Sequence, residues 1–144
     1  MKEEVIVLIV EDDDGHARLI EKNLRRARIN NQILRFADGQ QILDFLFRRG
    51  EGRQRGDFTR YLLLLDIRIP EMDGLEVLRQ IKQDEELRKI PVIMLTTTDA
   101  PREVDACHRL GCSHYIVKPV EYDKLSAMLG QLGLFLTIVR WTTP

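Results

Sequence analysis

The segment VLIVEDDDGHARLI, residues 7–20, joins a short apolar run to four consecutive carboxylates and then to a helical pattern. The run Val5 to Val10 is rich in β-branched residues and does not alternate with polar ones, which indicates a strand buried on both faces. From Gly15 onward, apolar residues recur at helical spacing. Carboxylates between the two could cap the helix or hold a cation. The segment therefore predicts a strand, an acidic turn and a helix.

Four further apolar runs repeat this alternation of strand and helix. Further strands are expected over residues 33–36, 61–65, 91–95 and 114–117. Helices are expected from residue 15, around residues 42–46, and over 75–81, 100–110 and 121 to about 136. Asp73 is interpreted as a helix cap, and Gly74 as a residue that supplies backbone freedom. Uniformly apolar strands that alternate with helices predict an α/β fold, in which a parallel sheet is covered on both faces.

Size and composition limit the possible functions. The 144 residues fit one domain spanning 1–144, with its core at about 4–136. The net charge of −1 gives no sign of a nucleic-acid partner. No segment reaches the roughly 18–20 apolar residues that a membrane span needs. The N-terminus does not resemble a signal peptide, so we expect a cytoplasmic protein.

Polar groups follow the predicted strands at the edge where a doubly wound sheet binds its ligands. Glu11 and Asp12 follow the first strand, Asp66 the third, Thr96 and Thr97 the fourth, and Lys118 the fifth. Clustered carboxylates repel one another unless a cation joins them, and hard oxygen ligands suit Mg²⁺. One carboxylate could act as a nucleophile toward phosphorus, with a hydroxyl and an ammonium group stabilising the phosphoryl oxygens. These groups predict phosphoryl transfer to an aspartate.

Four separated motifs resemble those of the receiver domains of two-component response regulators. They are VEDD (residues 10–13), LLLLDIRIPEMDG (62–74), IPVIMLTTT (90–98) and YIVKP (115–119). The resemblance covers about residues 4–136. It implies a (βα)5 flavodoxin-like fold with a five-stranded parallel sheet in the order 2-1-3-4-5. It also implies a phosphorelay protein that accepts a phosphoryl group from a sensor histidine kinase or a phosphotransfer protein.

The same resemblance assigns roles to individual residues. Asp66 is the implied phospho-acceptor. Glu11, Asp12, Asp66 and the backbone carbonyl of Arg68 are the implied Mg²⁺ ligands. Thr96, rather than Thr97, and Lys118 would contact the phosphoryl oxygens. Thr96 and Tyr115 would form the conformational switch, and the Lys118–Pro119 peptide would be cis. We further hypothesise that the Arg68 side chain affects the access of water to the acyl phosphate.

The subtype of receiver and the C-terminal segment of the chain allow a finer interpretation. We expect no output domain, and the chain is similar to the small stand-alone regulators paired with phytochrome-type histidine kinases. The stretch LGLFLTIVRW, residues 132–141, belongs to an apolar extension at about 130–144. Apolar residues occur nearly all round this last helix. The core of a single domain cannot cover so much apolar surface. We therefore expect a homodimer through the last helix and tail.

Two other functions remain possible for the same residues. One is a phosphohydrolase that works through an aspartyl-phosphate. Such enzymes often carry a second acid two residues after the nucleophile, where this chain has Arg68. The other is an interaction module that works without phosphorylation. The intact set of acids, hydroxyl and lysine at the strand ends argues against it. A signalling receiver, not an enzyme acting on other substrates, is therefore the main interpretation.

Four further features have ordinary structural interpretations. Cys107, His108, Cys112 and His114 lie close in sequence, but buried thiols are favoured over a zinc site. His16 is expected on a solvated helix face, with a contact to a kinase as the alternative. The arginine- and glycine-rich stretch at residues 48–60 is expected to be a mobile surface loop, not a nucleic-acid site. Of the four acids at 11–14, Asp14 is expected to begin the first helix, with Asp13 as a further candidate.

Overall fold

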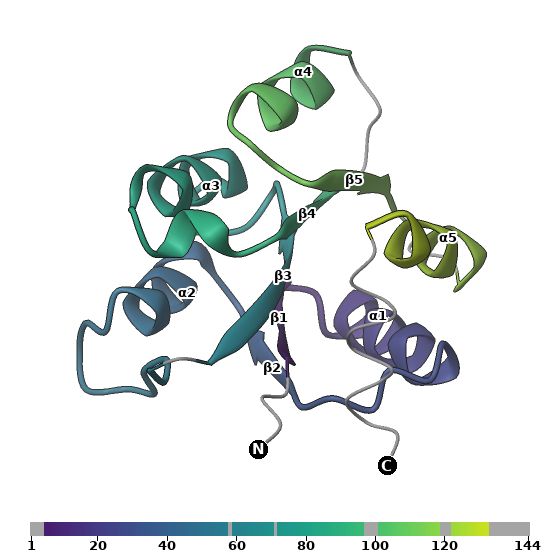
Figure 1. Ribbon diagram of the computed structural model, residues 1–144, viewed down its shortest axis with the longest axis horizontal. Helices are drawn as coiled ribbons and strands as arrows, with labels where there is room; N and C mark the ends of the chain where they lie inside the picture. The colour runs from purple at the N-terminus through teal and green to yellow at the C-terminus, as the bar shows by residue number, and fades with distance from the viewer. Residues whose placement is uncertain (1–4, 58, 71, 97–100, 119–121, 133–144) are drawn as a thin grey trace.

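The computed structural model describes residues 5–57, 59–70, 72–96, 101–118 and 122–132, in which strands and helices alternate (Figure 1). The strands are β1 (Val5–Val10), β2 (Ile33–Phe36), β3 (Arg60–Asp66), β4 (Val92–Thr96) and β5 (His114–Val117). The helices are α1 (Asp14–Arg26), α2 (Gly39–Leu46), α3 (Gly74–Gln83), α4 (Pro101–Arg109) and α5 (Tyr122–Leu132). A short 3₁₀ helix, η1 (Leu87–Lys89), precedes β4 and was not predicted.

The strands form one parallel sheet in the order β2-β1-β3-β4-β5. Val10 at the end of β1 lies beside Leu65, and Asp66 at the end of β3 lies beside Leu95. Thr96 at the end of β4 lies beside Val117. The predicted α/β fold and its strand order are therefore confirmed. The register also brings the carboxyl ends of β1, β3, β4 and β5 to one edge of the sheet.

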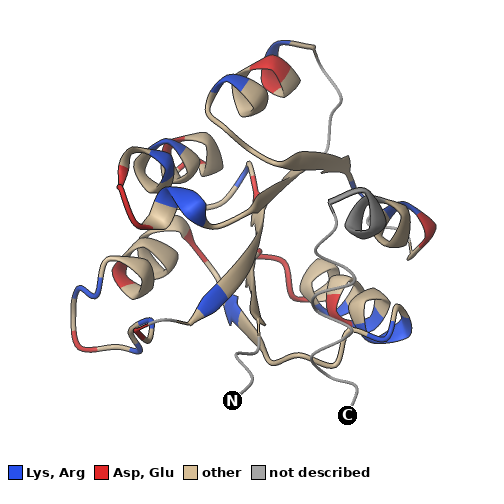
Figure 2. Cartoon of the chain, in the orientation of Figure 1, with Lys and Arg blue, Asp and Glu red and all other residues tan. Residues whose placement is uncertain are grey.

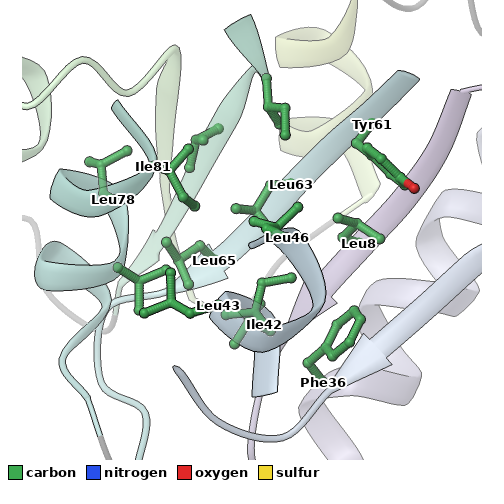
Figure 3. Packing of buried hydrophobic residues seen from close by; sticks show 14 of the residues in the cluster. Leu8, Phe36, Ile42, Leu43, Leu46, Tyr61, Leu63, Leu65, Leu78 and Ile81 are labelled. Carbon is green, nitrogen blue, oxygen red and sulfur yellow. The ribbon is translucent and has the colours of Figure 1, made fainter. Parts of the chain in front are cut away.

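Helices cover both faces of the sheet, which explains the uniformly apolar strands. Leu8, Leu63 and Leu65 point toward α2 and α3, where they pack with side chains from both helices (Figure 3). Leu62 and Leu64 point to the other face, into the cluster that includes residues of α1 and α5. Leucine has no strong preference for strands, so burial on both faces decides the structure of β3.

Aspartates begin three of the helices, because their carboxylates accept backbone N–H groups that the first turn leaves unpaired. The caps are Asp13 for α1, Asp38 for α2 and Asp73 for α3. The prediction for Asp73 is confirmed. Glycine is required at position 74, but not for the predicted reason. A Cβ atom there would lie 2.3 Å from the carbonyl oxygen of Asp66, so close approach of the backbone, not conformational freedom, requires glycine.

The loop between α2 and β3 is anchored by an arginine, which was not expected. Arg55 donates from Nε to the carbonyl of Leu46 at 2.6 Å, at the end of α2. Its Nη2 atom lies 3.1 Å from the carboxylate of Glu86. The Arg55 backbone N–H donates to the carbonyl of Phe45. Arg55 therefore ties this loop to the end of α2 and to Glu86.

Cys107 and Cys112 are buried free thiols, as expected. In the described part of the chain they form no metal-ligating group with the neighbouring histidines. No described helix is long and apolar enough to cross a membrane. Several predictions fall outside the described residues: the choice of Thr96 over Thr97 as the phosphoryl contact, the cis Lys118–Pro119 peptide, and the tail from residue 133 onward.

Candidate functional site

Three carboxylates meet at the carboxyl edge of the sheet. Glu11 and Asp12 follow β1, in the acidic segment between β1 and α1 that is red in Figure 2, and Asp66 ends β3. One oxygen from each lies within 4.8 Å of the other two. Glu11 is only 1% exposed and Asp66 only 3%, whereas Asp12 is exposed to solvent. The cluster therefore has a buried side and an open side, as a site that admits a ligand needs.

Lys118, which directly follows β5, supplies the positive charge of the cluster. Its Nζ atom lies 2.7 Å from Oδ2 of Asp66 and also pairs with Oε1 of Glu11. Burial raises the pKa of Glu11, and the bond from Lys118 opposes this rise only in part. Burial alone would lower the pKa of Lys118. Its bonds to Asp66 and Glu11 outweigh that effect, so the pKa is raised and the ammonium form is held.

Backbone hydrogen bonds fix the acidic turn. The N–H of Glu11 donates to the carbonyl of Phe36 at 3.0 Å, which continues the pairing of β1 with β2. The N–H of Asp13 donates to Oε2 of Glu11 at 3.2 Å. Asp13 in turn accepts the N–H of His16 at 2.9 Å, and this bond lowers the pKa of Asp13. His16 is half exposed, as expected, and its ring lies 3.8 Å from Glu11. Asp13 therefore caps α1, and Asp14 is the first residue of the helix.

A side chain from β2 also reaches this turn, which the sequence did not indicate. Arg35 donates from Nε and Nη2 to the backbone carbonyl of Glu11, at 3.1 and 2.9 Å. Its Nη1 atom pairs with Asp14. The sequence places no polar group at the end of β2, because the strand ends in Phe36. The available signal was a lone arginine inside an apolar strand, one residue before its end.

The Arg68 backbone contacts Asp66, and its side chain reaches Glu103 on α4. Its backbone N–H donates to Oδ1 of Asp66 at 3.1 Å, which fixes the second carboxylate oxygen. Its guanidinium is 68% exposed and lies 3.3 Å from Glu103, in the first turn of α4. The second oxygen of Glu103 is buried without a hydrogen-bond partner in the described residues. The ion pair therefore ties the loop after β3 to α4.

The remaining predicted site residues lie on β4 and β5. Thr96 ends β4, beside Val117, which places its backbone at the same edge as Asp66. The Thr96 side chain lies outside the described part. Tyr115 is half-buried on β5 and packs against the core on the side of α2 and α3. Its ring makes an edge contact with His108 of α4, with centroids 5.7 Å apart.

The donor set of this cluster fits one divalent cation. Three carboxylates face a single ammonium group, so two negative charges remain without a counter-ion in the cluster if all three are ionised. Carboxylate oxygens are the ligands that Mg²⁺ and similar hard cations prefer. Asp66 is held through both oxygens, by Lys118 and by the Arg68 N–H, and can act as an oriented nucleophile. The arrangement suits group transfer to Asp66 beside a bound metal ion.

Comparisons with known proteins identify the family. A family model described as the response regulator receiver domain matches residues 7–130. A probable methanogenesis regulatory protein, FilR2 of Methanothrix harundinacea, is 36% identical over 127 residues, which cover 88% of this chain and 80% of FilR2. The response regulator Rcp1 of Synechocystis is 34% identical over 130 residues, which cover 90% of this chain and 87% of Rcp1.

Two solved structures agree with this result. The bacteriophytochrome response regulator RtBRR superposes with a TM-score of 0.81 and 37% identity, over 92% of this chain and 79% of that one. The Mn²⁺-bound form of Rcp1 has a TM-score of 0.71 and 31% identity, over 90% of this chain and 92% of that one. The predicted receiver fold is thereby confirmed. This chain belongs to the response regulator receiver domains of two-component systems, of the small type represented by Rcp1 and the bacteriophytochrome response regulators.

Proposed function

We propose that this receiver accepts a phosphoryl group on Asp66 from the phosphohistidine of a sensor histidine kinase or a phosphotransfer protein, in a Mg²⁺-dependent reaction. The observation that carries the proposal is the buried Asp66 carboxylate, which Lys118 contacts at 2.7 Å beside Glu11 and Asp12. In the transfer, an oxygen of Asp66 bonds to phosphorus as the bond from phosphorus to the histidine nitrogen breaks. The departing imidazole takes up a proton.

Glu11, Asp12, Asp66 and the backbone carbonyl of Arg68 are the proposed metal ligands. Bound Mg²⁺ would offset the carboxylate charges and the charge on the transferring phosphoryl oxygens. The Mn²⁺-bound structure of Rcp1 supports a divalent cation in this family, and the carboxylate ligands suit magnesium. Lys118 would turn part of its interaction from Asp66 to a phosphoryl oxygen, and the Thr96 hydroxyl would bind another.

The switch in this proposal runs through β4, β5 and α4. Thr96 moves toward the phosphoryl group, and Tyr115 follows into the space that it leaves. The half-buried ring of Tyr115 and its edge contact with His108 support this, because a ring so placed couples β5 to α4. Phosphorylation thereby shifts the populations of two arrangements of the surface formed by α4, β5 and α5.

A phosphohydrolase acting on other substrates is the weaker candidate. It would need a second acid two residues after Asp66 to serve as general acid and base, and Arg68 occupies that position. The Arg68 guanidinium is engaged with Glu103, and it donates hydrogen bonds but does not accept them. In our proposal the protein promotes only its own phosphorylation and dephosphorylation.

The proposed kinase is of the phytochrome type, supported by the likeness to the bacteriophytochrome response regulator RtBRR. The proposal keeps the cytoplasmic location expected from the sequence, with no nucleic-acid or membrane partner. It also includes a homodimer through the last helix and tail, supported by the apolar pattern of residues 125–141. Size measurement at micromolar concentration should show a dimer for the full chain and a monomer after truncation at Gly133. A monomer in both cases would refute the dimer.

The experiment that tests the phosphorylation is labelling with a small phosphodonor, followed by intact-mass measurement. Wild type should gain one phosphoryl group with Mg²⁺ and none after chelation of the metal. Asp66→Asn should gain none, because its amide is a poor nucleophile. Asp105→Asn, an exposed substitution on α4, is the matched control and should behave as wild type. No adduct on wild type, or an equal adduct on Asp66→Asn, would sink the proposal.

A further inference from the structure

Arg35 holds the turn that carries Glu11 and Asp12 through the backbone of Glu11, not through the carboxylate of either residue. Its Nε and Nη2 atoms both donate to the backbone carbonyl of Glu11, at 3.1 and 2.9 Å. Its Nη1 atom pairs with the carboxylate of Asp14 at the start of α1. One planar guanidinium therefore spans the acidic turn from the end of β1 to the first residue of α1.

The two hydrogen bonds to the Glu11 carbonyl contribute more to holding the turn than the ion pair with Asp14 does. Asp14 is 76% exposed and the Arg35 side chain 34% exposed, and such a surface ion pair contributes little. The Glu11 carbonyl belongs to the peptide that joins Glu11 to Asp12, so two donors on this oxygen fix that peptide's orientation. The Glu11 N–H is already held by Phe36 at 3.0 Å. Both sides of Glu11 are therefore tied to β2.

The orientation of this peptide decides where the two carboxylates point. Glu11 is buried toward Asp66, and Asp12 is exposed, yet the three carboxylates come within 4.8 Å of one another. If the Glu11–Asp12 peptide rotates, Asp12 leaves the cluster, because Asp12 itself has no bond within the described residues that would hold its side chain there. A cation would then meet two acids instead of three.

We propose that Arg35 is a positioning residue for the divalent-cation site, and that it raises metal affinity by fixing the Glu11–Asp12 peptide. The inference rests on the proposed Mg²⁺ site and adds to it a residue on β2, outside the ligand set. Groups that orient metal ligands from behind typically account for about a 10- to 100-fold change in affinity. We expect Arg35→Ala to bind Mg²⁺ about tenfold more weakly than wild type, at the lower end of that range.

The sign of the effect separates positioning from simple electrostatics. Arg35 carries a positive charge close to a cation site, so removing that charge alone would strengthen Mg²⁺ binding. A positioning role predicts the opposite, namely weaker binding. Arg35→Lys keeps the charge and the length of the stem but loses the planar pair of donors. It should bind more weakly than wild type, and it serves as the second variant if Arg35→Ala does not fold.

Calorimetric titration with Mg²⁺ on the full chain is the direct test. The matched control is Arg79→Ala, which removes another exposed arginine paired with a carboxylate, Glu76 on α3. It should bind Mg²⁺ as wild type does. Phosphodonor labelling gives the second readout. The Mg²⁺ concentration for half-maximal rate should rise about tenfold in Arg35→Ala, while the rate at saturating Mg²⁺ stays near wild type.

The outcomes are distinguishable. Weaker binding by both Arg35 variants, with Arg79→Ala unchanged, supports the inference. Equal or tighter binding by folded Arg35→Ala overturns it and leaves the proposed function standing. A rate at saturating Mg²⁺ that falls as far as the affinity also overturns it, because that result indicates general damage to the site. No Mg²⁺ binding by wild type overturns the proposed function, and the inference with it.

Discussion

The ammonium group of Lys118 lies 2.7 Å from the carboxylate of Asp66, although 52 residues separate them in the chain. Lys118 also pairs with Glu11. One buried ammonium group therefore pairs with two buried carboxylates, and the three residues lie at the ends of three different strands. Breaking such a group leaves charges buried without a partner, which costs more than the pair contributes when intact. The stability of the metal-free protein should therefore depend strongly on this lysine.

Replacing Lys118 by methionine tests that dependence. In the absence of metal, we expect the free energy of unfolding to fall by about 3 kcal/mol, as for other broken buried ion pairs. Mg²⁺ should restore part of the loss, because a cation returns positive charge to the cluster. Urea denaturation at neutral pH, with and without Mg²⁺, measures both effects. Lys22→Met, at an exposed position of α1, is the control, and an equal loss in both variants would contradict the prediction.

Asp12 differs from Glu11 and Asp66 because it is exposed, and this difference gives a metal-specific prediction. Asp12→Asn should leave the metal-free stability within about 0.5 kcal/mol of wild type, as expected for a surface substitution. It should lose most of the stabilisation by Mg²⁺, which for wild type reaches about 2.7 kcal/mol at a concentration of 100 times Kd. Thermal unfolding at increasing Mg²⁺ measures both quantities. Equal stabilisation of variant and wild type would exclude Asp12 as a ligand.

The residues at the sheet edge could be predicted because strand ends and chain order fix them together. Once each apolar run is a strand of one parallel sheet, Glu11, Asp66 and Lys118 have to lie at the carboxyl ends of β1, β3 and β5, at the same edge. No knowledge of side-chain conformation is needed for that step. The burial of Ile42 and Leu43 against the sheet is predictable for the same reason, since the spacing defines one helix face.

Contacts that depend on the reach of long side chains could not be predicted in this way. Arg35 holds Glu11, Arg55 holds Leu46 and Arg68 meets Glu103, and each guanidinium could have extended into solvent without violating any pattern. Sequence spacing specifies on which face a Cβ atom lies, not where a flexible side chain with four torsions ends. For the same reason, the sequence does not show that Asp13 caps α1 while Asp14 pairs with Arg35.

The ion pair between Arg68 and Glu103 predicts opposite effects of two substitutions on dephosphorylation. Arg68→Ala should speed autodephosphorylation, because it opens the acyl phosphate to water. Glu103→Gln should slow it, because the released guanidinium can turn toward the phosphoryl group. Each change should stay below about tenfold, since an exposed ion pair is worth about 1 kcal/mol or less. Loss of the label after removal of the phosphodonor measures the rate, and equal rates in all three proteins would discard the idea.

The buried thiols of Cys107 and Cys112 make stability depend on alkaline pH. Burial, reinforced by the neighbouring Cys107, raises the pKa of Cys112 from 9.0 to about 11. Between these two pH values, the Cys112 thiol keeps its proton in the folded protein and loses it in the unfolded chain. The free energy of unfolding should therefore fall as pH rises from 9.0 to about 11. Chemical denaturation under reducing conditions measures the slope. Cys112→Ala should show a shallower fall than wild type, and identical slopes would contradict the assignment.

Gly74 offers a test of the packing behind Asp66. A Cβ atom there would lie 2.3 Å from the Asp66 carbonyl oxygen and 2.7 Å from the Cα of Ile67, and backbone atoms cannot move aside cheaply. Gly74→Ala should destabilise the protein by about 2 kcal/mol, within the usual range for overpacking. It should also slow labelling of Asp66, because the shift displaces the nucleophile from Lys118.

The matched control for Gly74 is Gly52→Ala, since an added Cβ at Gly52 meets no atom within 4 Å. Its stability should stay within about 1 kcal/mol of wild type, and its labelling should be unchanged. Urea denaturation and phosphodonor labelling on the same preparations compare the two variants. If Gly74→Ala were as stable and as reactive as Gly52→Ala, the close approach of α3 to the Asp66 backbone would have no role in holding the site.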